Sequence, residues 1–180
     1  MQDAYESKLE HISDLEAEGK SDEALACLDT ILEANRHQDH DGWLAWSIAD
    51  HRALILQEAG RYLEALQASA ALADLGFADV SQRWSHAVGA ARALEALGRD
   101  REAVAVLEDS LRHEDEKYLP AALSVLGWLV HISDKLALPV DPKWLRTAEA
   151  VARYHGVAMP TGDSPGKAIL ALEDLLRSKQ

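Results

Sequence analysis

Cysteine is almost absent from this chain: Cys27 is the only one among 180 residues, so no internal disulfide can form. Such a chain suits a reducing compartment, and we expect a cytoplasmic protein. Long apolar runs are missing too. The longest, residues 123–130, is far shorter than the roughly 20 apolar residues that span a bilayer, and the acidic N-terminus lacks the basic start of a signal peptide. We therefore expect no membrane segment and no secretory leader.

Positive charge is also scarce, with 18 Lys and Arg against 31 Asp and Glu and a net charge of −13. The imbalance is greatest in residues 1–41, which hold 12 acidic and 3 basic residues. A surface of one sign repels nucleic acid and anionic lipid and attracts basic partners. We expect another protein with a basic surface as partner. Simple solubility is the alternative explanation of the acidity.

Proline and glycine are few, with 5 and 10 residues, and runs of β-branched residues are nearly absent. Alanine and leucine dominate instead, which predicts an all-α fold.

What the chain does contain is an internal repeat. The pattern Gly-x-x-x-Glu-Ala begins at Gly19, Gly60 and Gly98, so its copies follow one another at intervals of about 40 residues. Counted from each glycine, an aromatic residue stands at −14, a leucine at −4 and an aliphatic residue at +6. These residues are Tyr5, Trp46 and Trp84, then Leu15, Leu56 and Leu94, then Leu25, Leu66 and Val104. Repeats of this period indicate stacked supersecondary units.

Each repeat glycine is read as the end of one helix and the turn into the next, because glycine adopts the left-handed conformation without steric cost. This predicts helix pairs at 3–18 and 21–35, 42–59 and 62–75, and 80–97 and 100–112. Asp41 is expected to cap the second pair, and Asp79 with Gln82 has the spacing of a capping box. We expect further helices at 117–135, 142–154 and 165–177, the last two beginning at Asp141-Pro142 and Ser164-Pro165.

These helices suggest one continuous domain. Residues 1–113 would form three helix pairs, and residues 114–180, where Gly-x-x-x-Glu-Ala does not recur, would pack on them and cover the open end of the stack.

The helix, glycine turn and helix, followed by Ala24, Ala65 or Ala103 five residues after the glycine, resemble the tetratricopeptide repeat (TPR). That family's small residue seven positions before the glycine is met by Ala53 and Ala91 and missed by Ile12. The repeats of this chain are also several residues longer than those of the family. The resemblance implies a TPR-like α-solenoid of antiparallel helix pairs with divergent C-terminal capping helices, and a non-catalytic protein-binding role.

In the TPR family a concave groove is lined by first-helix positions 13, 10, 6, 3 and 2 residues before the turn glycine. The resemblance places the following residues there: Glu6, Leu9, Ser13, Glu16 and Ala17; Ser47, Asp50, Leu54, Gln57 and Glu58; Ser85, Val88, Arg92, Glu95 and Ala96. The candidate protein-binding residues are the acidic, apolar and longer polar members: Glu6, Leu9, Glu16, Asp50, Leu54, Gln57, Glu58, Arg92 and Glu95. Trp43 joins them as a possible anchor, since tryptophan is enriched at interface hot spots. An ordinary solvated helix face is the alternative.

Short motifs that resemble catalytic or metal sites lack the required context. Gly19-Lys20-Ser21 ends like a phosphate-binding loop, but the glycine five positions earlier is replaced by Asp14. Residues 162–166 fit Gly-x-Ser-x-Gly, yet no histidine follows His155, so Ser164 is read as a helix cap. The loop 37–41 holds two histidines and two carboxylates, but its register is wrong for a calcium loop. We expect no cofactor, no metal and no enzyme activity.

Two hypotheses of function follow. The first is a protein-binding module that masks one cognate protein, as a bacterial immunity or antitoxin-like protein or a dedicated chaperone does. The second is a structural or regulatory scaffold whose repeats self-associate. An enzyme comes third and would depend on the loop 37–41. The sequence does not indicate the oligomeric state.

Overall fold

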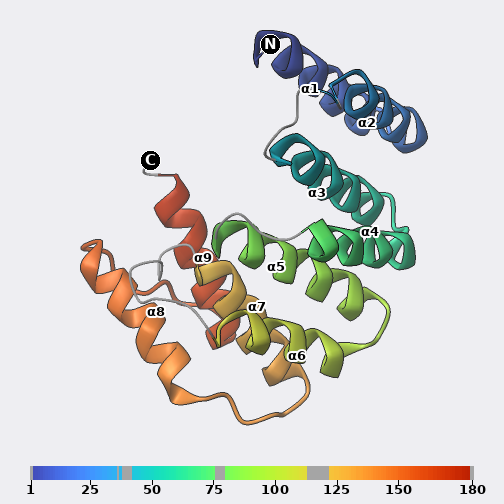
Figure 1. Ribbon diagram of the computed structural model, residues 1–180. Coiled ribbons are helices and arrows are strands. Elements are labelled where there is room, and N and C mark those ends of the chain that lie inside the picture. The colour runs from blue at the N-terminus through green and yellow to red at the C-terminus, as the bar shows by residue number, and fades with distance from the viewer. Residues whose placement is uncertain (1, 36, 38–41, 76–79, 113–121, 179–180) are drawn as a thin grey trace. The chain divides into compact units, whose positions relative to one another are not determined.

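The computed structural model describes residues 2–35, 37, 42–75, 80–112 and 122–178, and every regular element in these ranges is a helix. The helices are α1 (Gln2–Ala17), α2 (Ser21–Asn35), α3 (Trp43–Glu58), α4 (Tyr62–Leu75), α5 (Val80–Ala96), α6 (Asp100–Ser110), α7 (Leu123–Lys135), α8 (Pro142–Tyr154) and α9 (Pro165–Arg177) (Figure 1). The predicted all-α class is confirmed. None of the helices described is long and apolar enough to cross a membrane.

The helices belong to two compact units, Met1–Gly76 and Phe77–Gln180. In the first unit each helix packs against the next along the chain, from α1 to α4. In the second unit α5 packs on α6, and α7 packs on both of them. There α9 lies along α7 in a large contact, whereas α8 touches α7 and α9 only lightly. The predicted boundary between the repeats and the C-terminal helices, at residue 113, lies outside the described residues.

The three repeat glycines end their helices as expected. Gly19, Gly60 and Gly98 have φ of 73°, 73° and 71°, the left-handed conformation that glycine adopts without strain. The backbone N–H after each glycine donates to the carbonyl five residues earlier, as in Lys20 to Leu15 at 2.8 Å. This bond satisfies a carbonyl at the helix end, and the tight turn sends the second helix back along the first.

The repeat alanines allow the two helices of a pair to approach closely. Ala24, Ala65 and Ala103 are all 0% exposed. Of the first-helix positions seven residues before each glycine, Ala53 and Ala91 are buried, and so is the larger Ile12 of the first repeat. These residues form the core of each pair together with the leucines at −4 and, in the third repeat, with the buried Trp84.

The N-caps predicted for α8 and α9 are present in the structure. The Asp141 carboxylate accepts a hydrogen bond from the Lys143 backbone N–H at 2.8 Å, and the Ser164 hydroxyl accepts one from Lys167 N–H at 3.4 Å. Ser164 is therefore a helix cap. Capping of α3 by Asp41 and of α5 by Asp79 concerns residues outside the described ranges. The start of α7 is at Leu123, and the expected segment from 117 to 121 also lies outside them.

A fourth turn of the repeat type follows α7, at a residue that is not glycine. Ala137 has φ of 52°, and its N–H donates to Asp134 at 3.0 Å while Leu138 N–H donates to Ser133 at 2.9 Å. This bonding pattern is the one found at the repeat glycines. Ala137 also follows Gly98 at an interval that lies between those separating the three repeat glycines. α7 therefore ends with the same turn geometry as the first helices of the repeats, although its sequence lacks the repeat motif and α8 contacts it only lightly.

Candidate protein-binding face

The predicted face divides between the two units. In the first unit Leu9, Glu16 and Asp50 are half-buried, while Leu54 and Glu58 are exposed. Gln57 is only 6% exposed, so it cannot contribute directly to an accessible face. The side chain of Glu6 lies outside the described part of α1.

Glu16 of α1 and Glu58 of α3 are electrostatic neighbours. Burial raises the pKa of the Glu16 carboxyl, and the negative charge of Glu58 raises this pKa further, against a smaller lowering by His51. Burial also raises the pKa of Asp50, against a smaller lowering by His51. No Lys or Arg of the described residues forms an ion pair with Glu16, Asp50 or Glu58. We call these three carboxylates the acidic face.

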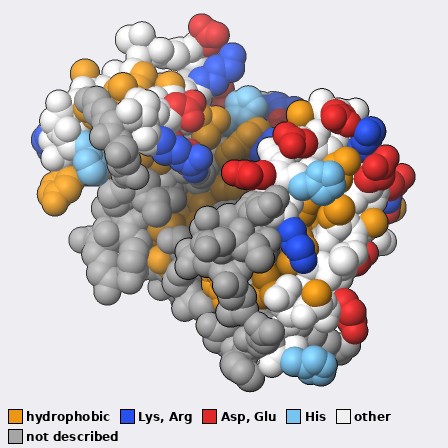
Figure 2. All heavy atoms as spheres, turned by 90° about the horizontal axis from the view of Figure 1, so that it is seen from above, with side chains coloured by type: hydrophobic (Ala, Val, Ile, Leu, Met, Phe, Trp, Pro, Cys, Tyr) orange, Lys and Arg blue, Asp and Glu red, His pale blue; other side chains and the backbone are white. Residues whose placement is uncertain are grey.

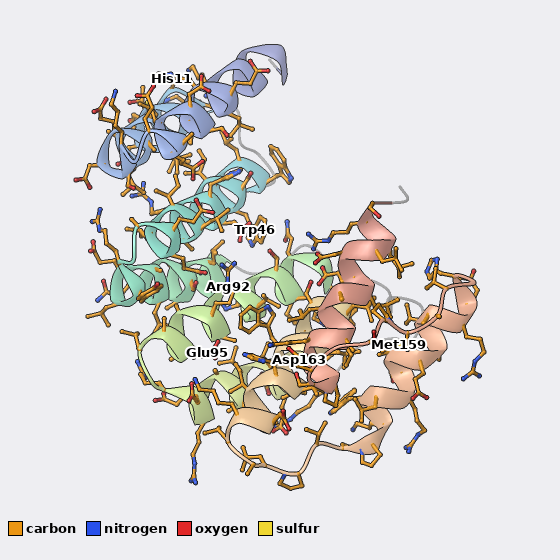
Figure 3. All side chains as sticks on the ribbon, turned by 180° about the vertical axis from the view of Figure 1, so that it is seen from behind. His11, Trp46, Arg92, Glu95, Met159 and Asp163 are labelled. Carbon is orange, nitrogen blue, oxygen red and sulfur yellow. The ribbon has the colours of Figure 1, made fainter. Side chains whose placement is uncertain are left out.

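In the second unit, the carboxylate of Glu95 stands at the repeat position of Glu16, and a lysine compensates its negative charge. Glu95 on α5 accepts a hydrogen bond from the Lys135 ammonium on α7, with an N–O distance of 3.3 Å. Lys135 also reaches Asp100 at 3.1 Å, and His131 Nε2 lies 3.7 Å from the Glu95 carboxylate. Through these contacts the Glu95 side chain of α5, labelled in Figure 3, links this helix to His131 and Lys135 of α7.

Arg92 on α5 also has a neighbour on α7. Its guanidinium carbon lies 6.0 Å from the ring centroid of Trp128 on α7, at the edge of cation–π range. Trp128 in turn meets His131 edge-on, with ring centroids 5.7 Å apart. Arg92 and Glu95 therefore have side-chain partners within the second unit, whereas the acidic face has His51 as an electrostatic neighbour but no ion pair with Lys or Arg among the described residues.

The Glu16–Glu58 and Glu95–Lys135 pairs occupy the same positions relative to the turns that end their helices. Glu16 and Glu95 both stand three residues before their turn residue, and Glu58 and Lys135 both stand two residues before theirs. The same pair of positions thus brings together two carboxylates in the first unit and a carboxylate with an ammonium in the second. His131 and Lys135 were not among the predicted site residues, because the turn after α7 has Ala137 where the repeats have glycine. The interval from Gly98 to Ala137, close to that between the repeat glycines, was the available signal.

Large apolar side chains are accessible on α3, the helix that carries Asp50 and Glu58. Trp43, in the first turn of α3, is 53% exposed, and Leu54 is 39% exposed. Trp46, at the repeat position shared with the buried Trp84, is half-buried (Figure 3). Figure 2 shows acidic side chains at many points on its right-hand side, where α1 and α2 face the viewer.

The short motifs that resemble catalytic or metal sites lie in turns and at helix ends. Gly19 and Lys20 lie in the turn between α1 and α2, and Ser21 is the first residue of α2. Within the described ranges, no three His, Cys, Asp or Glu side chains are grouped as metal ligands would be. Of the loop 37–41, His37 is described and exposed, and the other four residues fall outside those ranges. Cys27 is half-buried on α2.

No protein-family model matches this sequence, and no curated protein matches it significantly. Among solved structures, a crystal structure from Podosopora anserina, described as kinesin light chain nearly identical TPR-like repeats, is similar with a TM-score of 0.61. The alignment covers 97% of this chain and 95% of that chain, at 15% identity. The fold is TPR-like. At this identity the likeness concerns the fold alone, since one fold carries many binding specificities. TPR-like folds generally serve as protein–protein interaction scaffolds.

Proposed function

We propose that this TPR-like chain is a non-catalytic protein-binding module that captures a cognate protein through the acidic face of its first unit. The partner supplies a lysine or arginine to the space between Glu16 and Glu58. Leu54, one turn before Glu58, and Trp43, in the first turn of the same helix, add exposed apolar contact area along α3, and an exposed tryptophan is a typical interface anchor.

The proposal depends on a comparison of the same helix position in the two units. The position that holds Glu58 in the first unit holds Lys135 in the second, where the ammonium lies 3.3 Å from the matching carboxylate of Glu95. In the first unit the second carboxylate raises the pKa of Glu16 instead of neutralising its charge. A cation from outside would lower the energy of this pair in the way that Lys135 does for Glu95. The acidic face therefore has the chemistry of a site that a partner's cation completes.

The finer role follows from size and charge. A chain of 180 residues with a net charge of −13 suits a protein that masks one basic partner, as an immunity or antitoxin-like protein or a dedicated chaperone does. The single cysteine fits a cytoplasmic place of action.

Replacement of Glu58 by Lys tests the proposal, because it builds into the first unit the pair already present in the second. The variant Glu58→Lys should remain folded, and it should lose the partner that the unchanged chain captures from a lysate of its source. Glu149→Lys, at an exposed position of α8, reverses one charge in the same way and serves as the matched control. Equal capture by all three proteins would refute the acidic face as the binding site.

Self-association is the competing function, and the exposed Trp43 and Leu54 give it a specific surface. Light scattering of the purified chain separates the two. A monomer supports capture of a different protein. A stable dimer that Trp43→Ala dissociates would instead support the scaffold and remove the need for a second protein.

A further inference from the structure

Helix α8 is positively charged in a chain whose net charge is −13. It holds three basic residues and one acidic residue, Glu149. The basic residues are spaced by three and by seven positions, so they lie on one side of the helix, together with one small and one aromatic residue. We call this exposed set the basic face: Lys143, Arg146, Ala150, Arg153 and Tyr154.

The basic face is turned to solvent. The buried residues of α8, which are Ala148, Val151 and Ala152, lie on the other side of the helix, and α8 touches α7 and α9 only lightly. Figure 1 shows α8, in orange, at the edge of the second unit. Tyr154 is 85% exposed, and its ring meets the His155 ring edge-on, with centroids 5.2 Å apart. An exposed aromatic side chain beside cations is typical of a surface that binds a partner.

Two arginines of the basic face form no ion pair among the described residues. Arg146 and Glu149 have the same spacing as two pairs that do form, in which Arg61 and Arg99 each contact the glutamate three residues later, at 2.6 and 2.7 Å. Arg153, four residues after Glu149, is not paired with it either. The two guanidinium groups are therefore free to bind carboxylates from outside.

The stability of α8 does not account for these cations. A helix dipole favours cations at the C-terminus and disfavours them at the N-terminus. Lys143 lies in the first turn, where Asp141 balances its charge at 3.3 Å, and Arg146 follows in the second turn with Asp141 as an electrostatic neighbour. Of the three cations, Arg153 is the one in the last turn, where it stabilises the helix.

We propose that the basic face is a docking site for an acidic helix of another protein. Arg146 and Arg153 are seven residues apart, which is about 10 Å along α8, so they fit two carboxylates that are also two turns apart in the partner helix. The small side chain of Ala150 leaves room between the two arginines, and an apolar residue of the partner covers the Tyr154 ring.

Charge complementarity favours a short acidic segment over an extended polyanion. Nucleic acid or an anionic lipid surface would also meet the acidic residues that dominate the rest of the chain, and these would repel it. The basic face is independent of the acidic face, which belongs to the first unit and takes a partner of the opposite charge.

Binding of a fluorescent acidic peptide tests the proposal. The probe is an end-capped helical peptide of alanine, leucine and glutamine with glutamate at every seventh position, and the control peptide has glutamine there instead. Fluorescence anisotropy at low ionic strength should show binding of the glutamate peptide to the unchanged chain, and salt should weaken it. The double variant Arg146→Glu, Arg153→Glu should bind at least about tenfold more weakly. Arg101→Glu, Arg112→Glu reverses two exposed arginines in and just after α6 and should bind like the unchanged chain.

Tyr154→Ala gives a measurement that net charge alone does not alter. This variant should bind the peptide more weakly with the same salt dependence, since it loses apolar contact and no charge. Circular dichroism should be the same for all variants, because the replaced residues are exposed. Glu58→Lys, which should lose the partner of the acidic face, should still bind the peptide, so the two proposals can fail separately.

Four results would overturn the proposal. They are equal weakening in the two double variants, equal binding of the glutamate and glutamine peptides, tighter binding of single-stranded DNA or phosphatidylserine vesicles than of the peptide, and a dimer of the unchanged chain that Arg146→Glu, Arg153→Glu dissociates. The first two would leave the basic face as an ordinary solvated surface. The third would assign it to nucleic acid or a membrane, and the fourth to a second copy of this chain.

Discussion

Replacing Ala137 by glycine should stabilise the second unit, because the fourth turn places an alanine where the other repeats place glycine. The left-handed conformation costs a residue with a Cβ about 1–2 kcal/mol. Glycine avoids this cost but loses about 0.5–1 kcal/mol through its greater freedom in the unfolded chain. The balance at φ of 52° is a gain of about 0.5–1 kcal/mol for Ala137→Gly.

The reverse change, from glycine to alanine at one of the repeat turns, is the matched control variant. Gly98 has φ of 71°, and no atom lies within 4 Å of a Cβ placed there, so Gly98→Ala tests backbone conformation without a clash. It should cost about 1 kcal/mol. In a unit of this size that corresponds to about 4–8 °C in melting temperature.

Urea unfolding followed by circular dichroism measures both changes, and hydrogen exchange at α5–α7 assigns them to the second unit. Opposite shifts of the unfolding midpoint with an unchanged slope are expected. A lower midpoint for Ala137→Gly, or shifts of the same sign for the two variants, would refute the fourth repeat turn.

Three further predictions concern packing, metal and pH. Ala103→Leu should lose about 1–3 kcal/mol by overpacking, whereas Ala105→Leu at an exposed position of α6 should not; equal melting temperatures would show that the pair is not tightly packed. Chelator should not change stability, and stoichiometric zinc or calcium in the dialysed protein would assign a metal to the loop 37–41. Burial lowers the pKa of His86 from its ordinary 6.5, so hydrogen exchange should show the second unit losing stability as pH falls below 6.5, since the unfolded chain then binds the proton more readily. The raised pKa of Glu16 has the opposite sign, and its cost should appear in the first unit as pH rises above 4.5. A common pH trend in both units would contradict these two assignments.

The helix pairs could be predicted because their determinants are local. A glycine that must be left-handed and an alanine five residues later, as at Gly60 and Ala65, identify a turn and a close helix contact from the sequence alone. The turn after α7 could not be predicted in this way, because it has alanine in place of glycine. Ala137 adopts the left-handed conformation at a cost in free energy that the surrounding packing must offset.

The candidate site could be predicted less well, because it depends on which positions of neighbouring first helices meet. The sequence predicted that Glu16 and Glu58 share one face, but not that they are electrostatic neighbours, nor that the matching residues Glu95 and Lys135 form an ion pair. Position −3 is partly or fully covered in α1, α3 and α5. This agrees with the half-buried Glu16 and Glu95 and makes Gln57 a poor candidate for contact with a partner.

The measurement that tests the acidic face most directly is the association rate of the captured partner at low and high salt. The unchanged chain is compared with the double variant Glu16→Lys, Glu58→Lys and with the control Glu108→Lys, Glu149→Lys, which reverses two exposed charges of the second unit. Charges at a binding face act mainly on association and are screened by salt. The first double variant should associate much more slowly and should lose most of the salt dependence, while the control should resemble the unchanged chain. Equal slowing in both double variants, or a rate indifferent to salt, would contradict partner capture through Glu16, Asp50 and Glu58.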